Sequence, residues 1–455
     1  MVPSEEFKKK HERELEELKK CMKELKEDEK VLYSKECVAH SINFVVDKAN
    51  KEVTTLKDYE RFSCYLATIL ARDKEVVAVW LRVLSDHCEI YLSKNFAWES
   101  QDVKYINKIM MYLKDISKNA PAYSDRNESA FAEAITVYCS AKFESRYKKL
   151  RDYIKKNGSS EHVKSFKNFF SANINYVDRT SMIMTSHVCN MYYKKIKDKN
   201  DEKVKFSVLS EFLELIKKVG SYAGSIIGIV ECARNTQYKS LFSNSIVIKR
   251  SPVIINNQSI YSWKNIIRRF IDEDKYEDFM DRCLRKTNVT ERRSRAYTDH
   301  ATKQQQPLDG GDVKQYVYLH AEMNILSYII DNKIYGREFI AVSKKCCYLC
   351  ELYIDFAQKQ GYDIIVPGNH KKIYSGWKLP HVKDDNFKIS SLRYILENLN
   401  RIIGQKLEHY TRSLPAGPDN GGNSPNSSNS DGRYMVAPFK KVSKKVKMTD
   451  LLFDE

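Results

Sequence analysis

The spacing of apolar side chains predicts helices through the first half of the chain. Residues 5–30 are charged almost throughout, with acids and bases one helical turn apart, as at Glu16 and Lys20, which predicts a charged leader helix over residues 1–30. Farther on, apolar positions three and one apart, as on a buried helix face, occur at Phe62, Tyr65, Leu66, Ile69 and Leu70. The pattern is continued by Val76, Trp80, Leu81 and Leu84. Residues 31–235 are therefore expected to form a helical region.

The pattern changes after the helical region, where β-branched residues cluster. Two such runs, 245–249 and 252–255, are separated by two polar residues, which predicts a β-hairpin. A helix is expected over 262–284. The polar segment 286–306 is expected to be a flexible insertion, and its basic side chains include Arg292, Arg293 and Arg295.

The next part of the chain alternates between helix and strand patterns. An apolar run with helical spacing begins at residue 321, and a buried strand is expected over 337–343. A second helix then extends to residue 360, and a second strand covers 362–366. This order predicts an α/β domain, which we place at residues 240–410.

The last residues have the composition of a disordered segment. Residues 413–455 begin with a run rich in Pro, Gly, Ser and Asn and continue into a Lys-rich stretch from Phe439. That stretch could be a nuclear-localisation patch or a solvated basic tail. A disordered basic tail is therefore expected over residues 413–455.

Composition narrows the cellular context. The chain has 455 residues, of which 42% are apolar, enough for two or three domains with hydrophobic cores. No uncharged run exceeds 14 residues, so no membrane-spanning helix and no membrane partner are expected. The charged beginning does not resemble a secretory signal, which predicts an intracellular protein of the cytoplasm or nucleus. The net charge of +17 favours nucleic acid as a partner, although an AT-rich genome would produce the same Lys-rich composition.

Cysteine and histidine cluster at the starts of the two later helices. Cys346, Cys347 and Cys350 lie together, whereas the other eight cysteines are scattered singly. Cys347 and Cys350 are three apart at a helix start, so both could reach one metal ion, and His320 supplies a third ligand. Three protein ligands leave a position for water, whose pKa zinc lowers to about 7. Glu322 is placed to move protons rather than to bind the metal.

These residues carry a family resemblance. His320-Ala-Glu, then a strand and Cys347-Tyr-Leu-Cys350, resembles the H-x-E and C-x-x-C signature of zinc-dependent deaminases of the cytidine-deaminase-like superfamily. The chain is similar in particular to a family of predicted nucleic-acid deaminases from fungi and some intracellular bacteria. That family's Ser-Lys-x-x-Cys-x-x-Cys motif matches Ser343 to Cys350, and its later positions match Gly368, His370, Tyr374, Trp377 and Pro380.

The resemblance implies a fold and an activity. The implied fold class is α + α/β, with a helical N-terminal region followed by a deaminase-like α/β/α sandwich that contains a mixed sheet. The implied activity is zinc-dependent hydrolytic deamination of a nucleobase in a nucleic acid or nucleotide. Zn²⁺ would be held by His320, Cys347 and Cys350, with Glu322 as the catalytic residue. The alternative is a catalytically inactive zinc-binding deaminase fold that acts as a binding or interaction module.

Three points stay open at this stage. The superfamily's usual proline before the first cysteine ligand is Cys346 here, which adds a rival thiol. A closed structural zinc site would need a fourth ligand, which His370 or His381 could supply. The substrate-binding candidates are His370, Tyr374 and Trp377, which lie among lysines and would stack on bases of single-stranded nucleic acid or of a nucleotide, although Trp377 could instead close the core.

Overall fold

The computed structural model describes residues 5–48, 55–84, 87–121, 125–173, 182–198, 210–238, 242, 246–299 and 302–412. The described residues divide into two compact units, each assembled from distant parts of the chain. Unit 1 takes those within Met1–Glu52, Val253–Glu338 and Lys345–Met435, and unit 2 takes those within Val53–Pro252 and Phe339–Lys344. The expected fold class is confirmed, because helices of the N-terminal region precede a mixed sheet that is accompanied by further helices.

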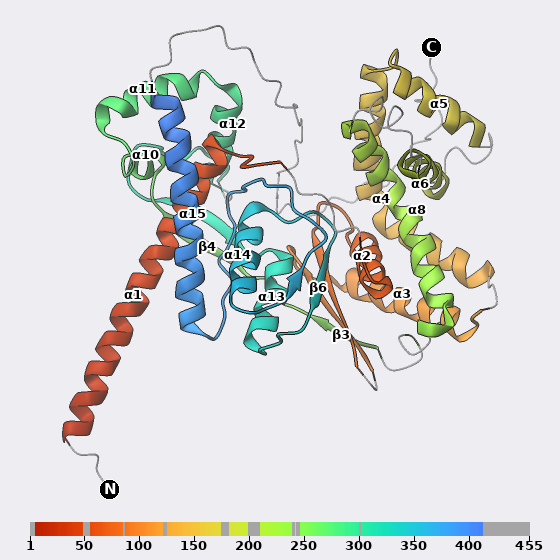
Figure 1. Cartoon of the computed structure of the whole chain (residues 1–455), viewed down its shortest axis with the longest axis horizontal. Helices are drawn as coiled ribbons and strands as arrows, with labels where there is room; N and C mark the ends of the chain where they lie inside the picture. Colours follow the sequence, from red (N-terminus) through yellow and green to blue (C-terminus); the bar gives the residue numbers. More distant parts are fainter. Residues whose placement is uncertain are drawn as a thin grey trace. The chain divides into compact units, whose positions relative to one another are not determined.

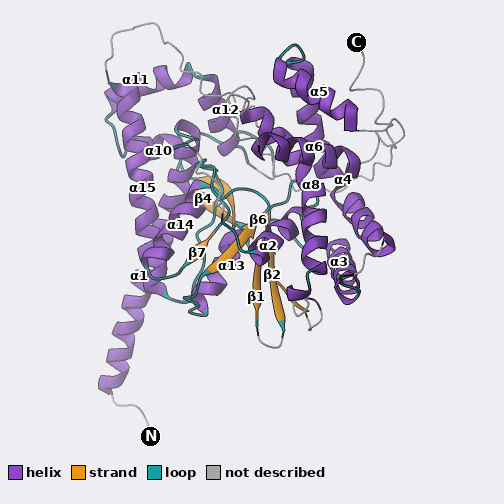
Figure 2. Cartoon of the chain, turned by 45° about the vertical axis from the view of Figure 1, so that its right-hand side comes forward, coloured by secondary structure: helices purple, strands orange, loops and turns teal. Residues whose placement is uncertain are grey.

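The sheet of unit 2 has both antiparallel and parallel neighbours. Strands β1 (Val77–Val83) and β2 (Cys88–Lys94) form an antiparallel pair, which Figure 2 shows as two adjacent strands. β1 also pairs antiparallel with β6 (Glu338–Val342), with Val79 opposite Ala341. β2 pairs in parallel with β3 (Ile246–Arg250). The resulting order is β3-β2-β1-β6.

Two expectations about these strands are wrong. The apolar run from Val76 to Leu84 was expected to continue a helix but forms β1. Its residues from Val77 to Leu81 are buried on both faces, and a run without a polar face carries no period that separates helix from strand. The expected hairpin of 245–255 does not form either, since β3 pairs with β2 and the next strand pairs elsewhere. β-branched residues indicate a strand but do not identify its partner.

The other elements that the structure describes in unit 2 are helices. They are α2 (Asp58–Ile69), α3 (Ser100–Lys118), α4 (Asp125–Lys156), α5 (Glu161–Asn173), α6 (Met182–Asp198), α8 (Ser210–Arg234) and the short 3₁₀ helix η2 (Thr236–Tyr238). α6 and α8 pack closely because Gly220 has no side chain: a Cβ there would lie 2.6 Å from the backbone nitrogen of Asn190. The predicted metal ligands, Glu322 and the substrate-binding candidates all lie in unit 1.

Unit 1 combines the start of the chain with its later part. Its helices are α1 (Glu5–Ile42), α10 (Trp263–Ile267), α11 (Glu273–Leu284), α12 (Thr287–Ala296), α13 (Ala321–Asp331), α14 (Tyr348–Lys359) and α15 (Asp385–Thr411). Its strands are β4 (Ile255–Ile260), β5 (Val313–Tyr318) and the short β7 (Ile364–Ile365). β4 and β5 pair antiparallel, and α1 packs against α15, as Figure 1 shows in red and blue. The predicted order of helix, strand, helix and strand corresponds to α13, β6, α14 and β7.

Several boundaries differ from expectation. α1 continues beyond residue 30 to Ile42, and the helix expected over 262–284 is divided into α10 and α11. The expected flexible insertion contains α12. That helix is held because Val289 and Ala296 are buried and because the Arg293 guanidinium lies 5.1 Å from the centre of the Trp263 ring.

Two expectations concern the ends and the membrane. The basic tail expected over 413–455 lies outside the described residues. Among the helices that the structure describes, none combines the length and the apolar character that crossing a bilayer requires.

Candidate metal centre

His320 stands between a strand and a helix, which fixes its direction. β5 ends at Tyr318, and His320 has extended backbone angles as the N-cap residue of α13. The Leu319 N–H donates to the Ile254 carbonyl at 3.0 Å, and the His320 carbonyl accepts from the Met323 N–H at 3.0 Å. These bonds hold the backbone on both sides of the imidazole.

The two cysteines occupy the first turn of α14. Cys347 is the N-cap residue, and its sulfur accepts a hydrogen bond from the Cys350 N–H at 3.4 Å. Ser343, directly after β6, is bonded to Val77 on β1: its N–H donates to the Val77 carbonyl and its hydroxyl accepts from the Val77 N–H, at 2.9 Å each. The start of α14 places both sulfur atoms at the positive end of the helix, which favours thiolate.

The three side chains converge on one point. His320 Nδ1 lies 3.6 Å from Cys347 Sγ and 3.2 Å from Cys350 Sγ, and the two sulfur atoms are 3.3 Å apart. All three residues are largely shielded from solvent, and the three atoms lie within 4.8 Å of one another. Ligand atoms around a tetrahedral zinc, with bonds of about 2.0–2.3 Å, would be roughly 3.5–3.8 Å apart. These three residues, which we call the metal group, could therefore hold a metal ion after a small expansion.

The charges in this group are coupled. Burial alone would raise the pKa of the Cys347 thiol, but Cys350 and His320 beside it lower that pKa to about 5. Burial raises the pKa of Cys350 well above its ordinary range, and the neighbouring Cys347 adds to the rise. Burial opposes the charged form of His320, yet Cys347 raises the pKa of the imidazole. A thiolate beside two further donor groups is an environment that attracts a metal cation.

Cys346 stays outside the group. Its side chain is buried, and burial together with the Glu322 carboxylate raises the pKa of its thiol well above the ordinary value. Its backbone instead connects two segments: its N–H donates to the Gly368 carbonyl at 3.0 Å, and its carbonyl accepts from the His370 N–H at 3.1 Å. Among the residues described, the metal group contains Cys347 and Cys350 but neither Cys346 nor His370 nor His381, so the proposed fourth ligand of a closed site is not brought there.

Glu322 lies beside the metal group without belonging to it. It is buried in the first turn of α13, and its carboxylate oxygen is 3.9 Å from His320 Nδ1. A carboxylate at this distance could exchange protons with a molecule bound between His320 and the two cysteines.

Two aromatic side chains flank the ligands. Trp377 is fully buried, and its indole N–H donates to Cys350 Sγ at 3.2 Å. The Tyr318 ring stacks on His320, with ring centres 5.4 Å apart. The enclosed indole fits the alternative that Trp377 closes the core, and its predicted role in substrate binding stays a prediction. Tyr318 was missed by the sequence reasoning, and its only signal is its place two residues before His320.

The other two substrate-binding candidates lie together. The His370 and Tyr374 rings are 5.4 Å apart, and Tyr374 also contacts Phe44, at 5.5 Å, from the chain just after α1. The cationic groups of Arg292 and Lys372 each lie 5.4 Å from the centre of the Phe44 ring. We call these five residues the basic-aromatic patch.

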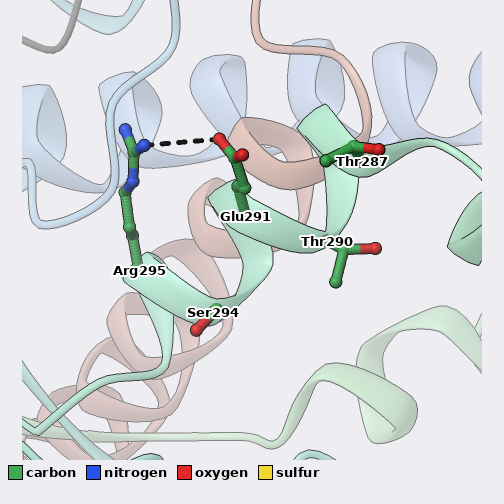
Figure 3. A pocket seen from close by; sticks show the side chains of 5 residues that line it. All are labelled: Thr287, Thr290, Glu291, Ser294 and Arg295. Atoms are coloured by element: carbon green, nitrogen blue, oxygen red, sulfur yellow. Dashed lines mark hydrogen bonds and ion pairs between the residues drawn. The ribbon is translucent and has the colours of Figure 1, made fainter.

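A separate hollow lies on α12. Figure 3 shows the side chains that line it, which are Thr287, Thr290, Glu291, Ser294 and Arg295. Glu291 and Arg295 form an ion pair of 3.4 Å. All five residues come from one helix. The hollow contains no residue of the metal group and none of the predicted substrate-binding residues.

Comparison with known proteins points to the segment that carries the metal group. Residues 319–381 match a protein family described as "OTT_1508_deam:-like deaminase". The matched segment includes His320, Glu322, Cys347 and Cys350. No match was found among curated proteins or among solved structures. The deaminase-like segment and a His-Cys-Cys group that could bind a metal both fit a deaminase.

Proposed function

We propose that this protein is a zinc-dependent hydrolytic deaminase that acts on a nucleobase in a nucleic acid or nucleotide. The observation that carries the proposal is the convergence of His320 Nδ1 with the sulfur atoms of Cys347 and Cys350, inside a segment similar to a deaminase family. Two sulfur donors and one imidazole suit zinc, and three protein ligands are typical of catalytic rather than structural zinc.

The chain's own residues would divide the chemistry as follows. When bound, zinc supplies the Lewis acidity that makes water nucleophilic near neutral pH. Glu322 takes one proton from the attacking water, delivers it to the ring nitrogen, and assists the amine as it leaves as ammonia. Water and the amino-substituted base thus become the carbonyl-containing base and ammonia. Burial of Glu322 keeps bulk water away from this proton transfer.

The basic-aromatic patch supports a nucleobase attached to phosphate. Its rings could stack on bases, and its two cations could contact phosphates. The patch lies next to the start of α14, because the His370 N–H donates to the carbonyl of Cys346. We also propose that the chain belongs to the family of predicted nucleic-acid deaminases from fungi and some intracellular bacteria.

A paired assay tests the proposal. Purified protein should contain one zinc per chain and should release ammonia from at least one member of a panel of bases, nucleosides, nucleotides and single strands. Glu322→Gln should keep the zinc and lose turnover, since Glu322 is not a ligand. Zinc without ammonia release from any substrate would instead favour the alternative, a catalytically inactive zinc-binding module.

A further inference from the structure

The N-terminal helix contacts the segment that carries Trp377. We call residues 371–379 the Trp377 loop. Chain segments that include α1 and the residues just after it bond to this loop at five points. The pairs are Tyr33 Oη with the Leu379 N–H (3.4 Å), Glu36 Oε1 with the Gly376 N–H (2.7 Å), His40 Nδ1 with the Ile373 carbonyl (2.8 Å), the Phe44 carbonyl with the Ile373 N–H (2.9 Å), and the Val46 N–H with the Lys371 carbonyl (3.0 Å).

Glu36 is the unusual member of this set. Its side chain has 0% exposure, and no ion pair joins it to a cation among the described residues. Its second carboxylate oxygen has no hydrogen-bond partner among the residues described. Burial raises the pKa of this carboxyl well above its ordinary value. Burial of a carboxyl group that is only partly hydrogen-bonded costs stability, so this position of Glu36 points to a role other than stabilising the fold.

The Gly376 peptide, which Glu36 binds, is connected to both His320 and Cys350 through neighbouring residues. Gly376 has a φ of +86°, and its carbonyl accepts from the Tyr318 N–H at 2.9 Å. Tyr318 stacks on His320, while Trp377, the neighbour of Gly376, donates to Cys350. One backbone turn thus connects to His320 on one side and to Cys350 on the other.

We propose that Glu36 is a positioning residue of the metal centre. By accepting the Gly376 N–H, it fixes the turn that sets the Trp377 indole on Cys350 and the Tyr318 ring on His320. The inference rests on the proposed metal centre and extends it beyond the matched segment 319–381, because α1 supplies a part of the site from residues more than 280 positions earlier. Groups that orient metal ligands typically change metal affinity by about 10–100-fold when removed.

Cobalt binding to the full chain tests this role. Glu36→Leu removes the acceptor at similar volume, whereas Glu36→Gln retains an acceptor oxygen. Co²⁺ affinity is measured by competition with a chelator, and the sulfur-to-cobalt absorption band reports the ligand geometry. We expect Glu36→Leu to lose at least about tenfold in affinity and to shift the band, and Glu36→Gln to restore most of both.

The control is Glu60→Leu. Glu60 is also a buried helical glutamate that accepts a backbone N–H, from Lys57 at 2.8 Å, but it belongs to unit 2. Its substitution should leave cobalt affinity unchanged. Wild-type affinity and band in Glu36→Leu would overturn the inference while leaving the metal centre intact. A wild type that takes up no cobalt would overturn both. If Glu36→Leu does not fold, Trp377→Phe serves instead, because it removes the indole N–H that Glu36 is proposed to position on Cys350. Unchanged cobalt affinity in that variant overturns the inference.

Discussion

In the metal group, the direction of each side chain separates Cys347 and Cys350 from Cys346. Cys347 and Cys350 direct their sulfur atoms to His320, and the intervening turn of α14 sets their spacing. Cys346, the immediate neighbour, uses its backbone to join the loop at Gly368. The spacing of the two ligands could be inferred from the sequence, because a helical turn fixes it locally. The hydrogen bond from Trp377 to Cys350 could not be inferred, because Trp377 lies 27 residues farther along the chain, in a loop.

Removal of one sulfur ligand should abolish metal binding. Cys350→Ala leaves two donors, so we expect the loss of stoichiometric zinc. The free energy of unfolding should fall by about 3–4 kcal/mol at zinc concentrations 100–1,000 times the wild-type Kd. Metal analysis and thermal unfolding with and without zinc measure this. Cys283→Ala, at another buried cysteine of unit 1, is the matched control. Stoichiometric zinc in Cys350→Ala would refute the ligand assignment.

The proline that is usual in the superfamily should be harmful at position 346. The Cys346 N–H donates to the Gly368 carbonyl at 3.0 Å, and a proline has no N–H to replace it. A buried carbonyl left without a partner costs about 1–3 kcal/mol, so Cys346→Pro should be less stable than Cys346→Ala by that amount. Denaturant unfolding of the two variants gives the difference. Equal stability would show that this hydrogen bond contributes little.

At the scale of elements, those with a local sequence pattern could be predicted, whereas contacts between distant segments could not. α13 and α14, whose N-cap residues are His320 and Cys347, were predictable because each has an apolar face and a distinct start. β1 was not, since an apolar run buried on both sides has no period. The contact between α1 and the Trp377 loop could not be predicted either. Glu36 and Gly376 are 340 positions apart, and no local sequence pattern links them.

The turn at Gly376 should tolerate no side chain. Its φ of +86° already disfavours other residues, and a Cβ there would lie 2.8 Å from the Tyr316 carbonyl oxygen. Gly361 is a matched control, because its φ is +92° but a Cβ would meet nothing within 4 Å. We expect Gly361→Ala to cost about 1–2 kcal/mol from backbone conformation alone. Gly376→Ala should cost more and should also weaken metal binding, as unfolding and chelator competition can determine. Equal effects would exclude a role for close packing.

At the scale of the whole molecule, both units are built from segments far apart in the chain. The sequence predicted boundaries between contiguous domains near residue 240 and residue 410, and those boundaries stay predictions. The structure shows that Phe339–Lys344 and Val53–Pro252 share one unit. Such grouping depends on which strands pair, and pairing is set by tertiary contacts rather than by local propensity.

Stability should decrease on acidification because of His40. Burial, followed by the nearby Arg292 and Arg295, lowers the pKa of this histidine to about 4, although its bond to the Ile373 carbonyl opposes the shift. The unfolded chain, with an ordinary value of 6.5, binds a proton first as the pH falls. Stability should therefore be complete above pH 6.5 and decline towards pH 4, by at most about 3 kcal/mol.

Substitution isolates the contribution of this histidine. His40→Gln should flatten the profile of unfolding free energy between pH 6.5 and pH 4, because the group that takes up the proton is gone. His381→Gln, at an exposed position, should leave the profile unchanged. An unaltered slope in His40→Gln would mean that other groups determine the acid sensitivity.

Binding of single-stranded nucleic acid should depend on the basic-aromatic patch and not only on the net charge of +17. A lysine that contacts a phosphate releases about one counterion, so its removal lowers the steepness of the salt dependence by about one. We expect Lys372→Gln to weaken oligonucleotide binding about 3–10-fold and to reduce that slope, and Tyr374→Leu to weaken binding without changing the slope, because stacking releases no ions. Lys383→Gln removes the same charge from an exposed position outside the patch and should have little effect. Titrations at two salt concentrations measure both quantities. Equal losses from the two lysine variants would assign binding to charge in general, and undetectable binding at low salt would leave a free nucleotide as the substrate.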